Sequence, residues 1–286
     1  MTGFVASILV LGGVVAVAAG LAMWFDMALA SGARAVASRE SEARRWRPPF
    51  VHGRELFEWA KATAVGTVEH VLSGPRDAGT PRRLTEAVEE GLEHAMVPGS
   101  PERSTAGPVP CPEVGQGVIA VTAPEAIVVA DHLRERLSES ELTRVRSESE
   151  DNVGWIQRIS SVYGSDAPCS LQGMDCVCAA WPVRPLRCRA VHAVSLARRR
   201  GDEDPWLAAG ARAHAERVTD GVLVGLRDGL REAGLDDGLY EMHSALARAL
   251  DVPDAAERWA RGEKLFATCF PHELEPPPHD SGLAVP

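Results

Sequence analysis

The stretch that decides the fold is VTAPEAIVVADHLRERLSESEL, residues 121–142. It contains the same helix-start signature twice, because Thr122 is followed three residues later by Glu125 and Ser138 is followed three residues later by Glu141. In such a capping box the hydroxyl and the acid each satisfy a backbone N–H group that the first helical turn leaves unpaired. We therefore expect one helix to begin at Thr122 and a second to begin at Ser138.

Segments on both sides of this stretch also have helical patterns. Apolar residues recur at intervals of three and four, as an amphipathic helix requires, and the expected helices cover residues 53–72, 82–96, 205–233, 236–250 and 254–261. Residues 118–121 suit a short extended piece, whereas residues 97–117 are rich in Pro and Gly and are expected to be irregular. The predicted fold class is mainly α, with an irregular cysteine-rich loop between Tyr163 and Arg189.

The N-terminus is almost purely apolar, since no charged side chain precedes Asp26. The run from Gly3 to Met23 exceeds the roughly 20 apolar residues that a helix needs to cross a bilayer. A secretory signal peptide cut after Ala28-Leu29-Ala30 is the alternative interpretation. However, Lys and Arg are absent before the run, and the run is longer than the roughly 7–15 apolar residues of a signal peptide. We predict an uncleaved transmembrane helix within residues 1–30.

The residues after the anchor predict its orientation. Residues 31–50 form a basic juxtamembrane linker, whereas no Lys or Arg lies before the anchor. The arginines of the linker are Arg34, Arg39, Arg44, Arg45 and Arg47. Because positively charged flanks stay on the cytoplasmic side, we expect a single-pass protein of the bacterial inner membrane, with its N-terminus outside and its soluble domain in the cytoplasm.

The predicted membrane helix also has a stripe of small residues. Gly12, Ala16 and Gly20 recur at every fourth position, which places them on one face where another helix can approach closely. Gly and Ala are common in membrane helices in general, so both interpretations stay open. The expected partners are the lipid bilayer and a transmembrane protein. A nucleic-acid partner is disfavoured, because the formal net charge is −10.

The soluble part is expected to have three regions: a helical part at 51–108, a cysteine-containing domain at 109–266 and a Pro-rich tail at 267–286. The chain has six cysteines, at positions 111, 169, 176, 178, 188 and 269. The cytoplasm keeps thiols reduced, which leaves metal binding or burial as the options. Thiolates gathered on a loop suit zinc or iron.

The block CAAWPVRPLRCR, residues 178–189, resembles the Cys-x-x-aromatic-x-x-Arg-Pro-x-x-Cys-Arg signature of the YkgJ-type cysteine-cluster family. Members are described as zinc- or iron-chelating domains of unknown reaction. The Cys169-Ser-Leu block and residues 121–142 are also similar to family blocks, and the resemblance covers about residues 109–266. It implies that metal ligands stand at Cys111, Cys169, Cys178 and Cys188, with Cys176 as a replacement. We expect Arg184 and Arg189 to anchor the loop through their planar guanidinium groups.

The chain departs from the family where the first cysteine cluster should stand. The family has Cys-x-x-Cys-Cys there, whereas this register gives Cys111, Val114 and Gly115. Two hypotheses follow. The chain is either a membrane-anchored, non-catalytic metal-binding protein, or an accessory subunit of a larger photosynthetic or respiratory membrane complex whose degenerate domain holds no metal. An enzymatic role, as in the flagellin lysine methylases that some relatives resemble, is disfavoured because no cofactor loop or nucleophile–base pair is recognisable.

Overall fold

The computed structural model describes residues 53–96, 119–158, 169–173, 177–191 and 205–272. Helices account for 69% of the described residues, which confirms the mainly α prediction. The α-helices are α2 (Gly53–Leu72), α3 (Thr80–Met96), α4 (Ala123–Arg136), α5 (Glu139–Arg158), α7 (Pro205–Glu232), α8 (Met242–Asp251) and α9 (Ala255–Ala260). Most of these helices begin and end within a few residues of the predicted positions, since periodicity and capping are local properties of the sequence.

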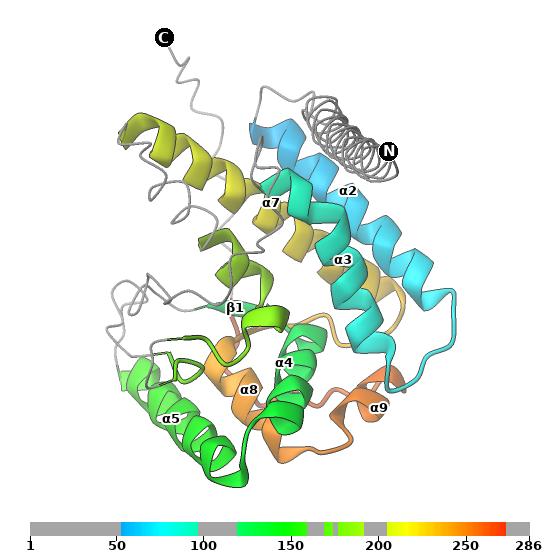
Figure 1. The fold of residues 1–286 in the computed structure, drawn as a ribbon. Helices are drawn as coiled ribbons and strands as arrows, with labels where there is room; N and C mark the ends of the chain where they lie inside the picture. The colour runs from blue at the N-terminus through cyan, green and yellow to red at the C-terminus, as the bar shows by residue number, and fades with distance from the viewer. Residues whose placement is uncertain (1–52, 97–118, 159–168, 174–176, 192–204, 273–286) are drawn as a thin grey trace, which may run out of the picture. The chain divides into compact units, whose positions relative to one another are not determined.

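Helices α2 and α7 lie side by side along most of α2 and form the most extensive helix contact of the described fold (Figure 1). Three glycines of α7 line this contact, Gly221, Gly225 and Gly229. A Cβ atom at Gly221 or Gly225 would overlap a backbone carbonyl oxygen of α2, and one at Gly229 would lie 2.8 Å from the Cβ atom of Val68. Because the glycines carry no side chain, the two backbones approach closely, and buried residues of α2 belong to the same core as those of α7.

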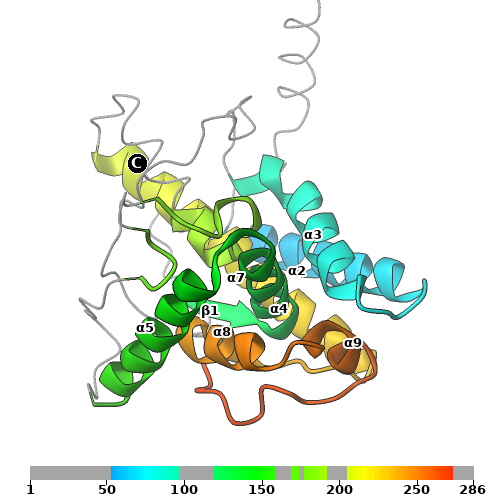
Figure 2. The ribbon, with the colours of Figure 1, turned by 60° about the horizontal axis from the view of Figure 1, so that its bottom comes forward.

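A two-stranded antiparallel sheet joins the middle of the chain to its C-terminal part. Strand β1 (Ala120–Thr122) pairs with β2 (Leu239–Glu241), and Val121 faces Tyr240 in the register. Each strand leads directly into a helix, β1 into α4 and β2 into α8. Helix α4 contacts α3, α8 and α9, while α5 packs on α8 (Figure 2). The sheet therefore sets where α4 and α8 begin.

The prediction of one continuous helix over 236–250 is wrong in its first half. Residues 239–241 form β2, and the helix begins only at Met242. The Glu241 carboxylate accepts hydrogen bonds from the backbone N–H groups of His243, at 2.9 Å, and Ser244, at 2.8 Å. It thus caps α8 in the way that N-cap acceptors do. A strand of three residues is too short to show a periodicity of two in the sequence.

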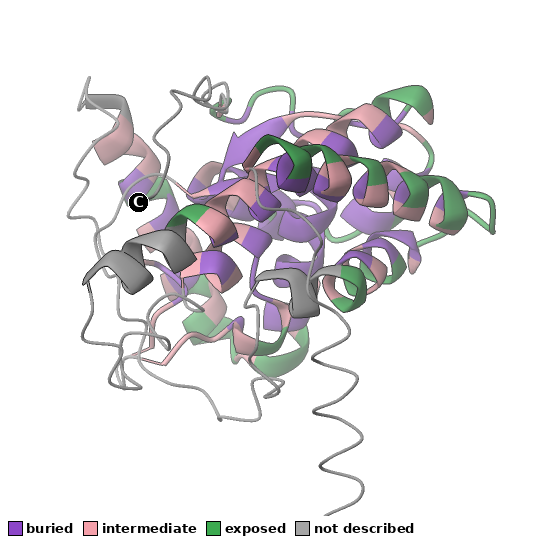
Figure 3. Cartoon of the chain, turned by 90° about the horizontal axis from the view of Figure 1, so that it is seen from above, coloured by how far each residue is buried: buried purple, intermediate pink, exposed green. Residues whose placement is uncertain are grey.

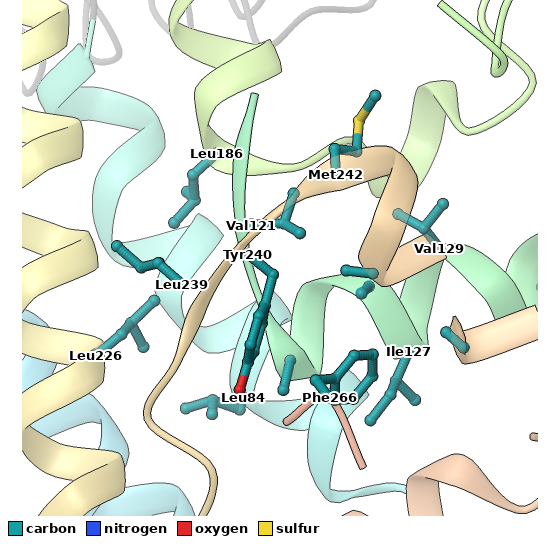
Figure 4. Close-up of a cluster of buried hydrophobic side chains, with 14 of the residues drawn as sticks. Leu84, Val121, Ile127, Val129, Leu186, Leu226, Leu239, Tyr240, Met242 and Phe266 are labelled. Atoms are coloured by element: carbon teal, nitrogen blue, oxygen red, sulfur yellow. The ribbon is translucent and has the colours of Figure 1, made fainter. Parts of the chain in front are cut away.

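One core extends from the contact of α2 with α7 to the sheet and to α3, α4, α8 and α9. Figure 3 shows the buried residues in purple. The rings of Tyr240 and Phe266 lie 5.6 Å apart between centroids, and Leu84, Ile127 and Trp259 are fully buried. Figure 4 shows the side chains of Leu84, Ile127, Tyr240 and Phe266 gathered in one apolar cluster. The hydroxyl of the buried Tyr240 also has a partner, because it donates a 2.6 Å hydrogen bond to Asp236.

None of the helices within the described ranges is long and apolar enough to cross a membrane. The predicted anchor at 1–30, with its stripe of Gly12, Ala16 and Gly20, lies outside those ranges, as does the linker at 31–50. Cys111 and Cys176 also lie outside them.

Candidate functional site

The predicted cysteine ligands that the structure describes belong to one chain segment, here called the cysteine loop and defined as residues 169–173 and 177–191. A small hairpin aligns its two parts, because Gln172 and Cys178 form an antiparallel bridge. The Ala179 N–H donates to the Leu171 carbonyl at 2.7 Å, and the Gly173 N–H donates to the Val177 carbonyl at 2.8 Å. The backbone near Cys169 is thereby held beside the backbone at Cys178.

The hairpin is followed by two short helical turns. The 3-10 helix η1 (Trp181–Val183) comes first, and residues 186–191 form a helical segment that carries Cys188. Cys169, Cys178 and Cys188 are each half-buried and pack against the hydrophobic core. The described part of the cysteine loop is therefore more regular than the sequence predicted. Pro182 lies at the start of η1 and Pro185 directly precedes the helical segment, and both are positions that proline favours.

Arg184 lies between the two turns and is the most unusual side chain of the cysteine loop. Its guanidinium stacks over the Trp181 ring, 3.5 Å from the centroid, and the residue is only 8% exposed. Its Nε and Nη1 atoms are buried and have no hydrogen-bond partner within the part of the chain that the structure describes. Buried polar groups in folded proteins normally have such partners, so this arrangement needs an explanation.

The pKa of Arg184 depends on its burial and on the charged groups near it. Burial, and to a lesser extent the positive charge of Arg189, lowers the pKa of the Arg184 guanidinium to about 10. Cys178 and Cys188 act in the opposite direction, because a thiolate at either position stabilises the cation. Negative charge on either sulfur would therefore favour the charged form of Arg184.

Arg189 holds the loop in place. Its Nε donates to the carbonyl oxygen of Arg184, and its Nη2 donates to that of Pro182, both at 2.9 Å. The same Nη2 forms a 2.8 Å ion pair with Glu89 of α3. Burial raises the pKa of Glu89 to about 7, and the Arg189 charge only partly offsets this effect. Arg189 thus has the geometry of an anchor between the loop and α3, whereas Arg184 contacts an aromatic ring.

Glu125 has a second role that the sequence did not show. Its Oε2 accepts hydrogen bonds from the backbone N–H and the hydroxyl of Thr122, both at 2.8 Å, as the capping box predicts. Its Oε1 accepts a further 2.8 Å bond from the backbone N–H of Leu186, at the start of the helical segment with Cys188. Burial raises the pKa of this carboxyl group. One buried side chain therefore fixes the starts of α4 and of this segment.

A buried polar network holds the other end of the cysteine loop. The hydroxyl of Ser170 lies 3.0 Å from Nδ1 of His243 on α8 and accepts a 2.9 Å hydrogen bond from Ser149 on α5. Asn152 lies 3.5 Å from Nε2 of the same imidazole. Since Ser170 follows Cys169 directly, this network connects the first cysteine of the loop to two helices. Burial lowers the pKa of His243 to about 4.

The low pKa of His243 predicts an acid-sensitive fold. The group titrates near 6.5 when unfolded and near 4 when folded, so the unfolded chain binds more protons between these values. The free energy of unfolding should be at its full value above pH 6.5 and fall as the pH drops toward 4, by up to about 3 kcal/mol from this residue. Urea unfolding of the full chain in mild detergent at pH 7 and pH 4.5 measures the loss.

The variant His243→Gln is the control for this prediction, because glutamine retains hydrogen-bonding capacity but does not titrate. Its free energy of unfolding should be lower at pH 7 and should change less between pH 7 and pH 4.5. An identical pH dependence in the variant and the wild type would show that His243 is not the responsible group.

Within the described ranges, no group of three or more His, Cys, Asp or Glu side chains is placed to hold a metal ion. A metal centre in the cysteine loop therefore needs Cys111 or Cys176 in addition to the described cysteines. Cys269 belongs to a different place: it is buried near α8, with its sulfur 3.6 Å from the carbonyl oxygen of Ser244.

Comparisons with known proteins do not assign a class to the chain. No family model, curated protein or solved structure matches it. Its function is therefore argued from the residues of the cysteine loop and from their surroundings.

Proposed function

We propose that the chain is a non-catalytic protein that binds a zinc or iron ion through its cysteine loop and is tethered to the bacterial inner membrane by residues 1–30. One observation carries the metal-binding part of this proposal. The Gln172–Cys178 bridge holds the backbone near Cys169 beside Cys178, and Cys169, Cys178 and Cys188 are each half-buried against the same hydrophobic core. Thiolates brought together on a rigid and partly buried loop are the ligands that zinc and iron prefer.

The residues around the thiols fit such a centre. A zinc or iron ion bound by several thiolates has a net negative charge, and a buried cation with unused N–H donors is the group that would offset that charge. Arg184, which is buried and whose Nε and Nη1 have no hydrogen-bond partner among the described residues, suits this role. The ligands would be Cys178 and Cys188, together with Cys111, Cys169 or Cys176. If protein ligands fill all coordination positions, the metal has no open position for a substrate. Its binding free energy would then stabilise the folded state.

Hydrogen bonds from Arg189 and to Glu125 also fix the backbone of the cysteine loop. Arg189 donates to two carbonyl groups of the loop, and Glu125 accepts from the backbone N–H of Leu186. Supporting contacts of this kind orient metal ligands and increase metal affinity. The resemblance of residues 178–189 to the YkgJ-type signature supports the same function, and the arginine-rich linker at 31–50 supports a cytoplasmic position for the loop.

The metal content of cysteine variants tests this function. The full chain, purified in mild detergent without chelators, should contain about one zinc or iron ion per chain by elemental analysis. Cys178→Ser and Cys188→Ser should each lose most of the metal, since serine does not replace a thiolate ligand of zinc. The matched control is Cys269→Ser, which changes a buried cysteine outside the loop and should retain the wild-type content.

Two outcomes would contradict the proposal. Equal metal content in all three variants would mean that the metal is not bound by the loop. A metal-free wild type that co-purifies with other membrane proteins would favour the accessory-subunit hypothesis, with Gly12, Ala16 and Gly20 as the candidate packing face in the membrane.

A further inference from the structure

We propose that a pH-dependent clamp holds the helical segment at residues 186–191 against α3, in which Glu89 favours the closed arrangement when it is protonated and loosens it when it is ionised. The clamp does not require a bound metal and goes beyond the proposed function. Its parts are three carboxyl groups that hold the segment, the charges around one of them, and a small cavity beside that group.

Two of the carboxyl groups fix the start of the segment. Glu125, at the start of α4, accepts a 2.8 Å hydrogen bond from the backbone N–H of Leu186. Asp220 of α7 forms an ion pair with Arg187. Burial raises the pKa of both carboxyl groups. The first two residues of the segment are therefore attached to two different helices.

Glu89 of α3 provides the third attachment, one turn further along the segment. Its carboxylate forms a 2.8 Å ion pair with Arg189, which also donates to two carbonyl groups of the loop. The Glu89 side chain is 27% exposed and that of Arg189 is 21% exposed. An ionised carboxylate is costly in such a place, because an ion pair offsets only part of the hydration that is lost.

The charges around Glu89 determine how the clamp responds to pH. Burial is the largest cause of its raised pKa, which is about 7, and the negative charges of Glu125 and Glu86 act in the same direction. The Arg189 cation acts against them but does not cancel them. The charge of Glu89 in turn favours the cationic form of Arg184. Ionised Glu89 is thus less stable in the closed arrangement than in water, despite its ion pair.

A small cavity beside Glu89 marks the place where the clamp can open. It has a volume of about 10 Å³, lies between α3, α4, α7 and the segment, and is lined in part by Glu89, Glu125 and Leu186. An opening at this junction exposes the Glu89 carboxyl to water, which lowers its pKa toward the ordinary value of 4.5. Because the closed state keeps a proton that the open state releases, opening becomes easier as the pH rises from about 4.5 to about 7 and then levels off.

Hydrogen exchange of backbone amides, measured by mass spectrometry on the full chain in mild detergent, tests the clamp. The wild type is compared with Glu89→Gln, which cannot ionise, at the same pH, so that the intrinsic exchange rates cancel. The N–H of Arg189 donates to the Pro185 carbonyl at 3.0 Å and is one of the amides that report on the segment. The ratio of wild-type to variant exchange rates for residues 186–191 should rise at least about five-fold between pH 5 and pH 8.

The matched control is Glu86→Gln, which neutralises an exposed glutamate on the same helix. Its exchange rates in the segment should stay equal to those of the wild type at both pH values. A rise of the same size with this variant would overturn the inference, because the effect would then come from the surface charge of α3.

Two further results would overturn the inference. One is a ratio for Glu89→Gln that does not change with pH. The other is a ratio that is higher at pH 5 than at pH 8, which would mean that the ion pair outweighs burial. If Glu89→Gln does not fold, the wild type alone decides: protection of the segment, corrected for intrinsic rates, should fall from pH 5 to pH 8, and unchanged protection overturns the inference. The metal content of the cysteine variants tests the proposed function separately.

Discussion

Replacing Gly225 by valine is expected to destabilise the fold by about 4 kcal/mol, a large part of the marginal stability of a domain. A Cβ atom at this position would overlap the carbonyl oxygen of Lys61 and lie 2.8 Å from the Cβ atom of Ala64. A backbone oxygen cannot turn away as a side chain can, so α2 and α7 would have to separate. Intrinsic helix propensity favours valine over glycine by only a few tenths of a kcal/mol, and the packing effect should therefore dominate.

The matched control is Gly66→Val on the exposed face of α2. A Cβ atom there meets nothing within 4 Å, so the free energy of unfolding should stay within about 0.5 kcal/mol of the wild-type value. Urea unfolding of the two variants, monitored by circular dichroism, measures the difference. Equal stability of Gly225→Val and Gly66→Val would mean that α2 and α7 do not pack through their backbones.

The second large effect is expected at Glu125. Replacing it by alanine removes the acceptors of the Thr122 and Leu186 donors. These groups are buried beside the core, where each unsatisfied donor costs about 1–3 kcal/mol. We expect the free energy of unfolding to fall by about 4 kcal/mol in total. Because Leu186 begins the segment with Cys188, the variant should also expose that cysteine to alkylation faster than the wild type.

The chain offers a surface copy of the same motif as the control. Glu141 accepts hydrogen bonds from the backbone N–H of Ser138 at 2.8 Å and from its hydroxyl at 2.6 Å, but this capping box is exposed to solvent. Water can replace the lost acceptor, so Glu141→Ala should cost only about 0.5–1 kcal/mol. Similar losses in the two alanine variants would show that burial does not set the importance of Glu125.

Local signals explain which parts of the fold were predictable from the sequence. The capping residues Thr122 and Ser138 and the apolar periodicity of α2 and α7 act within a few residues, and the corresponding helices form where they were predicted. Strand β2 was missed because it consists of three residues and forms only by pairing with β1. The glycines of α7 lower its helix propensity, and their purpose is visible only once α2 lies against them.

In the candidate site, too, the features formed by neighbouring residues were predictable from the sequence, whereas the long-range contacts were not. The block at 178–189 identified the cysteine loop and its arginines, because these residues are neighbours in sequence. The bond from Leu186 to Glu125 and the contact of Ser170 with His243 join residues that are far apart in the chain. No pattern of period or spacing indicates such pairs. The loop could be located from the sequence, whereas the groups that hold it required the structure.

The most direct test of metal binding by the cysteine loop is X-ray absorption at the zinc and iron edges, on the full chain purified in mild detergent. The account predicts an ion surrounded mainly by sulfur, at about 2.3 Å in the case of zinc. An absent edge, or a shell made only of oxygen and nitrogen, would contradict it.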